Sequence, residues 1–323
     1  MSLAVVKNPL SSKSSGGVWF LFGHNSDVLS IATDGSDVFA TCDAGGVGLL
    51  WKHNRSAYDG GPMHVCGIKT GGPAILDACF LNHTRLCTAQ GDGNVGVWNV
   101  ETAQCVDSIC RKSGRGRSSD WSVINSLTVL DGKLIVYGGD DGFLVLCDPL
   151  QNKIFSTINM RVPITSVVAS SDSLFVADVL GGIRCLDTRV LRSLYILRTH
   201  RDVVSSLVLN DDATMLVSYG MDNLLALWDV APFALSASDR LLHRCNIHQG
   251  ESRNLLRCDW SKKGTILVPA GDGKIFRVNA SLFEEVKMTL PVSHQEEPAQ
   301  CVAFLGDEVA ASCARSEVIL QPA

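Results

Sequence analysis

The stretch Tyr219-Gly-Met-Asp-Asn-Leu-Leu-Ala-Leu-Trp228-Asp229 decides the fold. Asp222 and Asn223 accept the positive φ that a tight hairpin needs, and residues 224–228 form an apolar strand that ends in Trp-Asp. Another apolar run, residues 215–218, comes just before the turn. The segment therefore predicts two antiparallel strands joined by a short hairpin.

Six further segments repeat this form, an apolar strand that ends in Trp or another apolar residue. They are residues 47–51, 95–99, 143–148, 183–187, 275–279 and 318–320. The intervals between successive anchor residues are 47, 49, 39, 42, 50 and 42, with a mean near 45. A four-stranded propeller blade takes about 40 to 45 residues. We therefore predict an all-β, seven-bladed β-propeller.

The two ends of the chain predict how the ring closes. Residues 17–22 form an apolar strand with no partners of their own before the first blade, and the last repeat stops soon after its third strand. We expect the N-terminal strand to complete the last blade, which leaves that sheet edge paired. This makes residues 17–323 one domain, preceded by a flexible lead, residues 1–16.

Composition bounds the function. The chain has 323 residues, a net charge of -5 and 46% hydrophobic residues, which is typical of a folded protein and unlike one that coats nucleic acid. We find no apolar run long enough for a membrane span and no signal peptide, and expect a soluble, intracellular protein without membrane contact. The 12 cysteines stand mostly singly in apolar runs, which indicates free thiols.

The repeats resemble those of the WD-repeat family, and the fifth is the most complete. It carries His200, Ser218, Asp222 and Trp228. In that family these positions form a hydrogen-bonded set inside a blade, which satisfies polar groups that burial would otherwise penalise. The same residue types could be taken for a Ser-His-Asp catalytic triad, but they fall on the structural positions of the repeat, and we expect no catalysis there.

The other repeats keep only part of this set. The second repeat has Thr88, Asp92 and Trp98 but no His. The first has His24, Thr41 and Trp51, with Gly45 where the Asp is expected. The fourth and seventh have neither the Asp nor the Trp, so we expect apolar packing to hold them.

Motifs for enzymes or cofactors are absent from the sequence. Residues 91–96 spell G-x-G-x-x-G, but they lie in a hairpin that runs into a strand rather than opening a helix, which argues against a dinucleotide site. No zinc-ligand spacing or nucleophile motif occurs. We expect no cofactor, metal or enzyme activity. A hydrolase with one channel metal ligand per blade is the remaining catalytic alternative.

A longer stretch resembles a narrower group, the WD-repeat subunit of the spliceosomal U5 small nuclear ribonucleoprotein (U5 snRNP). The matching segments are residues 219–223, 228–234, 246–248 and 253–261. The resemblance implies a non-catalytic scaffold for pre-mRNA splicing in the nucleus. It would act as a monomer within the particle, docked on the large U5 core scaffold protein and other spliceosomal proteins. A WD-repeat adaptor in translation initiation or signalling is the alternative.

Loops at the ends of the strands supply the candidate partner-binding residues. On the side of the ring where we expect the His and Asp of each repeat, they are Arg111, Lys112, Arg115, Arg117, Trp121, Arg201, Met221, His248 and Arg253. Phe233 is expected on the opposite side. The dense basic run 111–117 is either a solvated loop or a contact with RNA phosphate or an acidic partner. Direct RNA contact stays open, and we expect association mainly through proteins.

Overall fold

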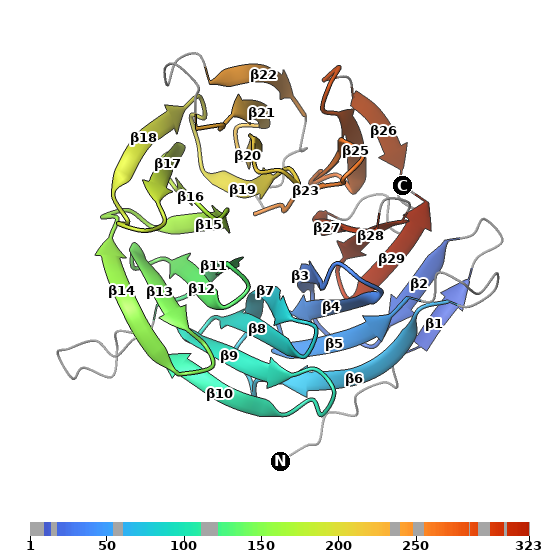
Figure 1. The fold of residues 1–323 in the computed structure, drawn as a ribbon. Helices are drawn as coiled ribbons and strands as arrows, with labels where there is room; N and C mark the ends of the chain where they lie inside the picture. Colours follow the sequence, from blue (N-terminus) through green and yellow to red (C-terminus); the bar gives the residue numbers. More distant parts are fainter. Residues whose placement is uncertain are drawn as a thin grey trace.

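Seven antiparallel sheets stand around a common axis, one for each predicted repeat (Figure 1). The computed structural model describes residues 10–13, 18–53, 61–110, 122–232, 240–247, 255–283, 285–289, 298–306 and 309–322. Within these ranges all regular structure is β-strand, so the prediction of an all-β, seven-bladed propeller is confirmed. We number the blades 1 to 7 in chain order.

Each blade is a four-stranded meander whose first strand lies nearest the axis. Blades 1 and 2 consist of β3 (Val28–Thr33), β4 (Val38–Asp43), β5 (Val47–Lys52) and β6 (Met63–Lys69), then β7 (Ile75–Asn82), β8 (Arg85–Gln90), β9 (Asn94–Asn99) and β10 (Cys105–Cys110). Blades 3 and 4 consist of β11 (Ile124–Leu130), β12 (Leu134–Gly139), β13 (Phe143–Asp148) and β14 (Lys153–Asn159), then β15 (Ile164–Ala169), β16 (Ser173–Asp178), β17 (Gly182–Asp187) and β18 (Ser193–Arg198). Blades 5 and 6 consist of β19 (Val204–Leu209), β20 (Met215–Gly220), β21 (Leu224–Asp229) and β22 (Leu241–Asn246), then β23 (Asp259–Trp260), β24 (Thr265–Pro269), β25 (Lys274–Asn279) and β26 (Glu285–Thr289).

Blade 7 takes its fourth strand from the start of the chain. It consists of β27 (Ala299–Leu305), β28 (Val309–Ala314), β29 (Glu317–Pro322) and β2 (Trp19–Phe22). Trp19 pairs with Leu320 and Leu21 with Val318. The predicted ring closure is therefore confirmed, and it joins residues about 300 positions apart in the sequence.

The predicted flexible lead, residues 1–16, is wrong for residues 10–13. Strand β1 (Leu10–Lys13) pairs antiparallel with β2 as a fifth strand of blade 7. Its side chains are exposed, so the strand depends on backbone pairing and on Lys13, whose Nζ lies 5.5 Å from the centre of the Trp19 ring. A strand with no apolar alternation leaves little signal in the sequence.

The hydrophobic core is divided among the seams between neighbouring blades. Each cluster of buried side chains combines residues of two adjacent sheets, for example Ala226 and Trp228 of blade 5 with Phe175 and Leu197 of blade 4. Strands inside the blades are therefore buried on both faces, which explains their nearly continuous apolar sequence. This accounts for the high hydrophobic content that the composition shows.

Turn chemistry repeats at each end of the third strand. The hairpin before this strand has a positive φ at the same place in every blade: Gly46, Gly93, Gly142, Gly181, Asn223, Gly273 and Arg315. After the strand, in blades 2 to 6, an Asp or Asn accepts backbone N–H groups two or three residues ahead, as Asp187 does from Arg189 and Val190. Such Asx turns fix the start of the next hairpin. This role explains why an acid follows Trp228 in the sequence.

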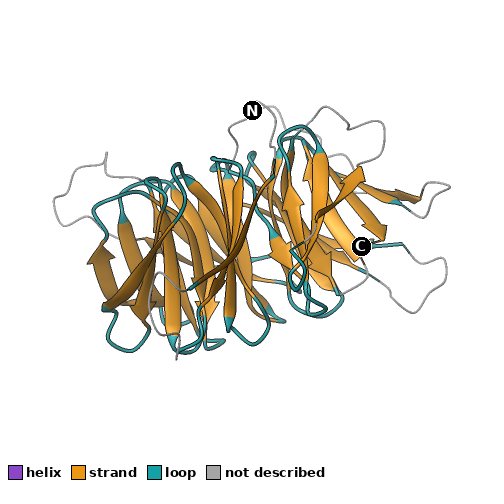
Figure 2. Ribbon diagram, turned by 90° about the horizontal axis from the view of Figure 1, so that it is seen from above, coloured by secondary structure: helices purple, strands orange, loops and turns teal. Residues whose placement is uncertain are grey.

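Turned edge-on, the ring has one set of loops on each face (Figure 2). The face that carries the hairpins between second and third strands also carries the connections between blades, and we call it the His/Asp face. No helix in the described part of the chain is long and apolar enough to cross a membrane.

Candidate functional site

Blade 5 brings together the four residues of the predicted hydrogen-bonded set. His200 Nδ1 lies 3.0 Å from Asp222 Oδ1, and its Nε2 lies 2.8 Å from Ser218 Oγ. Trp228 Nε1 donates to the same hydroxyl over 2.8 Å. Ser218 is fully buried, so its Oγ has no path to a substrate. The geometry satisfies buried polar groups and links strands β20 and β21 to the connection before β19 and to the hairpin between β20 and β21.

Asp222 anchors this set to the surface. Its carboxylate also accepts the N–H groups of Arg201, over 2.9 Å, and of Leu224, over 3.2 Å. Burial raises the pKa of Asp222, but the hydrogen bonds from His200, Arg201 and Leu224 outweigh it and lower the pKa below the ordinary value. The carboxylate is thus ionised at neutral pH, and both of its oxygens are occupied.

Blade 1 has an equivalent set that the sequence reading missed in part. His24 Nδ1 lies 2.8 Å from Asp43 Oδ2 and its Nε2 2.8 Å from Thr41 Oγ1, to which Trp51 Nε1 also donates. The acid was expected at position 45, which is Gly45. It comes instead from Asp43, two residues earlier. Asp43 is the last residue of β4 and its carboxylate also accepts Gly45 N–H. A search that allowed the acid at this earlier position would have found it.

Blade 2 shows what happens without the histidine. Trp98 Nε1 donates to Thr88 Oγ1 over 2.9 Å, and the Gln90 amide takes a second, longer bond of 3.4 Å to the same hydroxyl. Asp92 stays in its own hairpin, where it accepts the N–H and the side-chain amide of Asn94.

The prediction that blade 4 lacks the acid is wrong. As in blade 1, the acid is the last residue of the second strand. Asp178 ends β16 and its Oδ1 caps the following hairpin.

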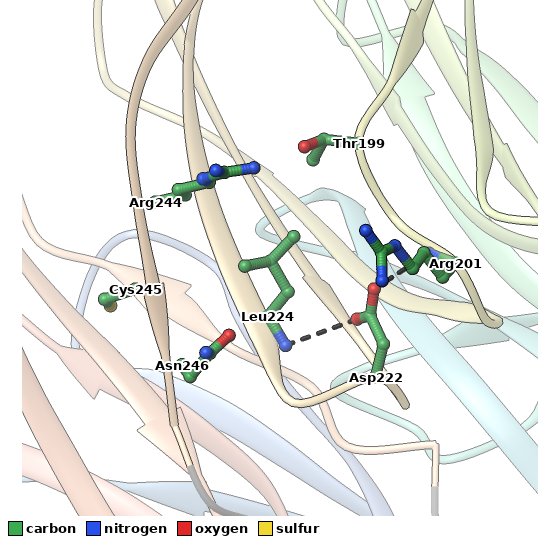
Figure 3. Close-up of a pocket in the computed structure, with 7 residues that line it drawn as sticks. All are labelled: Thr199, Arg201, Asp222, Leu224, Arg244, Cys245 and Asn246. Carbon is green, nitrogen blue, oxygen red and sulfur yellow. Dashed lines mark hydrogen bonds between the residues drawn. The ribbon is translucent and has the colours of Figure 1, made fainter.

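A polar pocket of about 370 Å³ opens on the His/Asp face at the seam of blades 4 and 5 (Figure 3). Its walls are Thr199, Arg201, Asp222, Leu224, Arg244, Cys245 and Asn246. Arg201 and Arg244 stand on opposite sides and extend their guanidinium groups towards the space between them. Both side chains are exposed.

The axis of the ring encloses a second cavity, of about 290 Å³, lined by the first strands of the blades. Arg257 extends into it from the chain just before β23 of blade 6. Its Nη1 lies 3.4 Å from Asp77 Oδ2 of blade 2, and its Nη2 donates to the backbone carbonyl of Asn125 in blade 3. The side chains of Arg257 and Asp77 are 18% and 12% exposed. One arginine thus connects opposite sides of the ring.

Around this channel, side chains of one blade bind backbone N–H groups of the next. Asp77 Oδ2 accepts from Leu127, and Ser166 Oγ accepts from Leu207. Asp259 Oδ2 accepts Phe304 N–H over 2.7 Å, and burial raises the Asp259 pKa to about 6. Both carboxyl groups are engaged by the protein itself. Among the residues that the structure describes, no three His, Cys, Asp or Glu side chains are grouped to hold a metal ion.

Known proteins with detectable similarity support this structural reading. Protein SPA1-RELATED 3 of Arabidopsis thaliana is 25% identical over 219 residues, which make up 66% of this chain and 25% of that protein. Eukaryotic translation initiation factor 3 subunit I of Culex quinquefasciatus is 27% identical over 158 residues, 45% of this chain and 48% of that protein. The WD repeat-containing protein 55 homolog of Dictyostelium discoideum is 25% identical over 173 residues, 52% of this chain and 40% of that protein.

These similarities and the seven-bladed ring support a WD-repeat family. The chain spans less than half the length of these curated relatives. No family model matches it. The WD-repeat relatives suggest an interaction scaffold or adaptor as the general role, because such propellers act by protein–protein contact.

Two predicted partner-binding residues of this seven-bladed propeller lie within the described ranges. Arg201 is exposed and lines the polar pocket, while Met221 is half-buried in the hairpin next to Asp222. The others, Arg111, Lys112, Arg115, Arg117, Trp121, Phe233, His248 and Arg253, lie outside the described residues. Arg244 was missed, since a lone arginine in an outer strand has no sequence signal until β22 is placed beside the loop of Arg201.

Proposed function

We propose that this chain is a non-catalytic interaction scaffold. The buried state of Ser218 carries the proposal, because the side chain that most resembles a nucleophile is held by His200 and Trp228 inside the sheet. The channel carboxylates are likewise engaged, Asp77 by Arg257 and Asp259 by backbone amides. What the ring offers outward is two faces of loops on a rigid support, which is how scaffolds bind several partners at once.

The finer proposal is a role in the U5 snRNP, docked on its large core scaffold protein in the nucleus. Its support is the sequence resemblance of residues 219–223, 228–234, 246–248 and 253–261. Part of that resemblance lies on elements with a structural role, since residues 219–223 form the hairpin that positions Asp222. The acidic net charge of -5 agrees with association through proteins rather than along RNA.

A role in translation initiation is the second candidate. The observation that favours it is the 27% identity to translation initiation factor 3 subunit I over 158 residues. None of the three relatives named above is described as a spliceosomal protein. The two candidates predict different partners and can be separated by one experiment.

That experiment is affinity purification of the tagged full chain from its own cells, followed by identification of protein and RNA. We expect U5 RNA and the large core scaffold protein. Recovery of initiation factors and ribosomal proteins instead would refute the U5 role and support the second candidate. Recovery of nothing above a tag-only control would refute the scaffold itself.

A variant of the chain tests the basic segment, residues 111–117, in the same experiment. Arg111, Lys112, Arg115 and Arg117 are changed together to Glu. If the segment contacts RNA phosphate or an acidic partner, recovery of that component falls because the attraction becomes repulsion. Unchanged recovery would mean that the segment is a solvated loop without a partner contact.

A further inference from the structure

The polar pocket on blades 4 and 5 has an excess of positive charge that the fold does not use. Two guanidinium groups, of Arg201 and Arg244, face one carboxylate, of Asp222. Asp222 is committed to His200 and to the backbone N–H groups of Arg201 and Leu224. In the described part of the chain, neither guanidinium group makes an ion pair.

The position of Arg244 is set by strand geometry. In β21, Ala226 and Trp228 pack towards blade 4, and Ala226 pairs with Arg244 of β22. Side chains alternate along a strand, so Asn246 projects on the same face as Arg244, towards blade 4. The pocket is therefore formed by strands β21 and β22 as well as by the loop of Arg201.

The opposite wall is also fixed by packing. Gly181, at a φ of +83°, lies so close to the next loop that a Cβ there would be 2.7 Å from the carbonyl oxygen of His200 and 3.1 Å from that of Asp202. This contact sets the hairpin of blade 4 against the loop of Arg201. The hairpin carries Leu180, which is 72% exposed. An exposed apolar side chain thus lies one residue from the contact with the loop of Arg201.

We infer that this pocket binds an anionic side chain of a protein partner. A guanidinium group binds carboxylate or phosphate oxygens in a bidentate manner, and the Thr199 hydroxyl and Asn246 amide add neutral donors. One net positive charge suits one acidic side chain, while a nucleic acid needs a longer run of cations. The exposed Leu180 favours a peptide segment with an apolar residue near the acid. The inference deepens the scaffold proposal and rests on it.

The test uses three peptides that differ only at the centre, with Glu, phosphoserine or Gln, and carry a Leu nearby. Binding to the full-length protein is followed by nuclear magnetic resonance at the Nε–H groups of Arg201 and Arg244. We expect saturable shifts with the Glu and phosphoserine peptides and at least tenfold weaker binding of the Gln peptide. Added salt should weaken the first two, because exposed charges are screened. If the phosphoserine peptide binds ten times more tightly than the Glu peptide, the partner is phosphorylated. If these two peptides bind equally, the partner residue is a carboxylate.

The variant R201E/R244E should bind the acidic peptides at least tenfold more weakly. R192E is the control, since Arg192 is also exposed but lies in the hairpin between β17 and β18, on the opposite face of the ring. Unchanged thermal melting of both variants verifies that they fold. Equal binding of all three peptides, binding of none, or an unchanged preference in R201E/R244E would overturn the inference. The scaffold proposal fails separately, when purification of the wild-type chain recovers no partner.

Discussion

The arginine that crosses the channel gives the sharpest prediction on stability. We consider Arg257→Met, which keeps an unbranched stem but is shorter than arginine and removes the guanidinium group with its charge. At 3.4 Å and an effective dielectric constant of about 20, the attraction between Arg257 and Asp77 is about 5 kcal/mol. Desolvation of both charges offsets much of this.

The expected net loss is smaller because Asp77 keeps other partners. Its carboxylate still accepts the Leu127 and Ala78 N–H groups and the Ser30 hydroxyl after the arginine is gone. We therefore expect Arg257→Met to lower the free energy of unfolding by about 2 kcal/mol, below the roughly 3 to 5 kcal/mol typical when a buried pair loses one member.

Urea unfolding of the wild type, Arg257→Met, Asp77→Asn and the double variant measures the coupling directly. We expect a coupling energy of about 1 to 2 kcal/mol, with Arg192→Met, an exposed control, within about 0.5 kcal/mol of the wild type. A coupling below about 0.5 kcal/mol would refute the argument, since separate sites agree with additivity to that extent.

Three further changes test other parts of the structure. Trp228→Phe removes the indole N–H from Ser218 Oγ inside blade 5 and should lower the free energy of unfolding by about 1 to 2 kcal/mol; a loss below about 0.3 kcal/mol in urea would contradict the role assigned to this bond. Asp259, with a pKa raised to about 6, binds a proton more tightly in the folded state, so stability should fall as pH rises from about 4 to about 6, by up to about 3 kcal/mol, and Asp259→Asn should flatten that profile. In native protein at neutral pH, iodoacetamide should modify the exposed Cys105 and Cys110 first; mass spectrometry that finds the fully buried thiols equally modified would refute the packing described.

The parts of the fold that follow from local chemistry could be predicted from the sequence. The turn residues before each third strand marked six hairpins, because Gly and Asn tolerate a positive φ. The seventh hairpin uses Arg315, at a φ of +49°, and gives no such sign. Strand β1 escaped notice for a related reason, since its side chains are exposed and it pairs with β2 through its backbone.

The candidate site was only half visible in the sequence. Ser218, Asp222 and Trp228 lie within eleven residues of one another, and His200 precedes them at the spacing of the repeat, so pattern alone could group them. Arg257 and Asp77 are 180 positions apart and meet only because the ring turns back on itself. Arg244 and Arg201 become neighbours only when β22 lies beside the loop that precedes β19. Contacts of this kind leave no repeating pattern in the sequence from which they could be predicted.

The pairing of β2 with β29 has a consequence for how the protein is made. Six blades consist of neighbouring stretches of chain and can form one after another as synthesis proceeds, but β2 must wait for a partner made some 300 residues later. Until then the apolar side chain of Leu21, which the closed ring buries, stays exposed to solvent and to other chains. The strand that locks the finished ring is thus a segment that needs protection from aggregation while the chain is being synthesised.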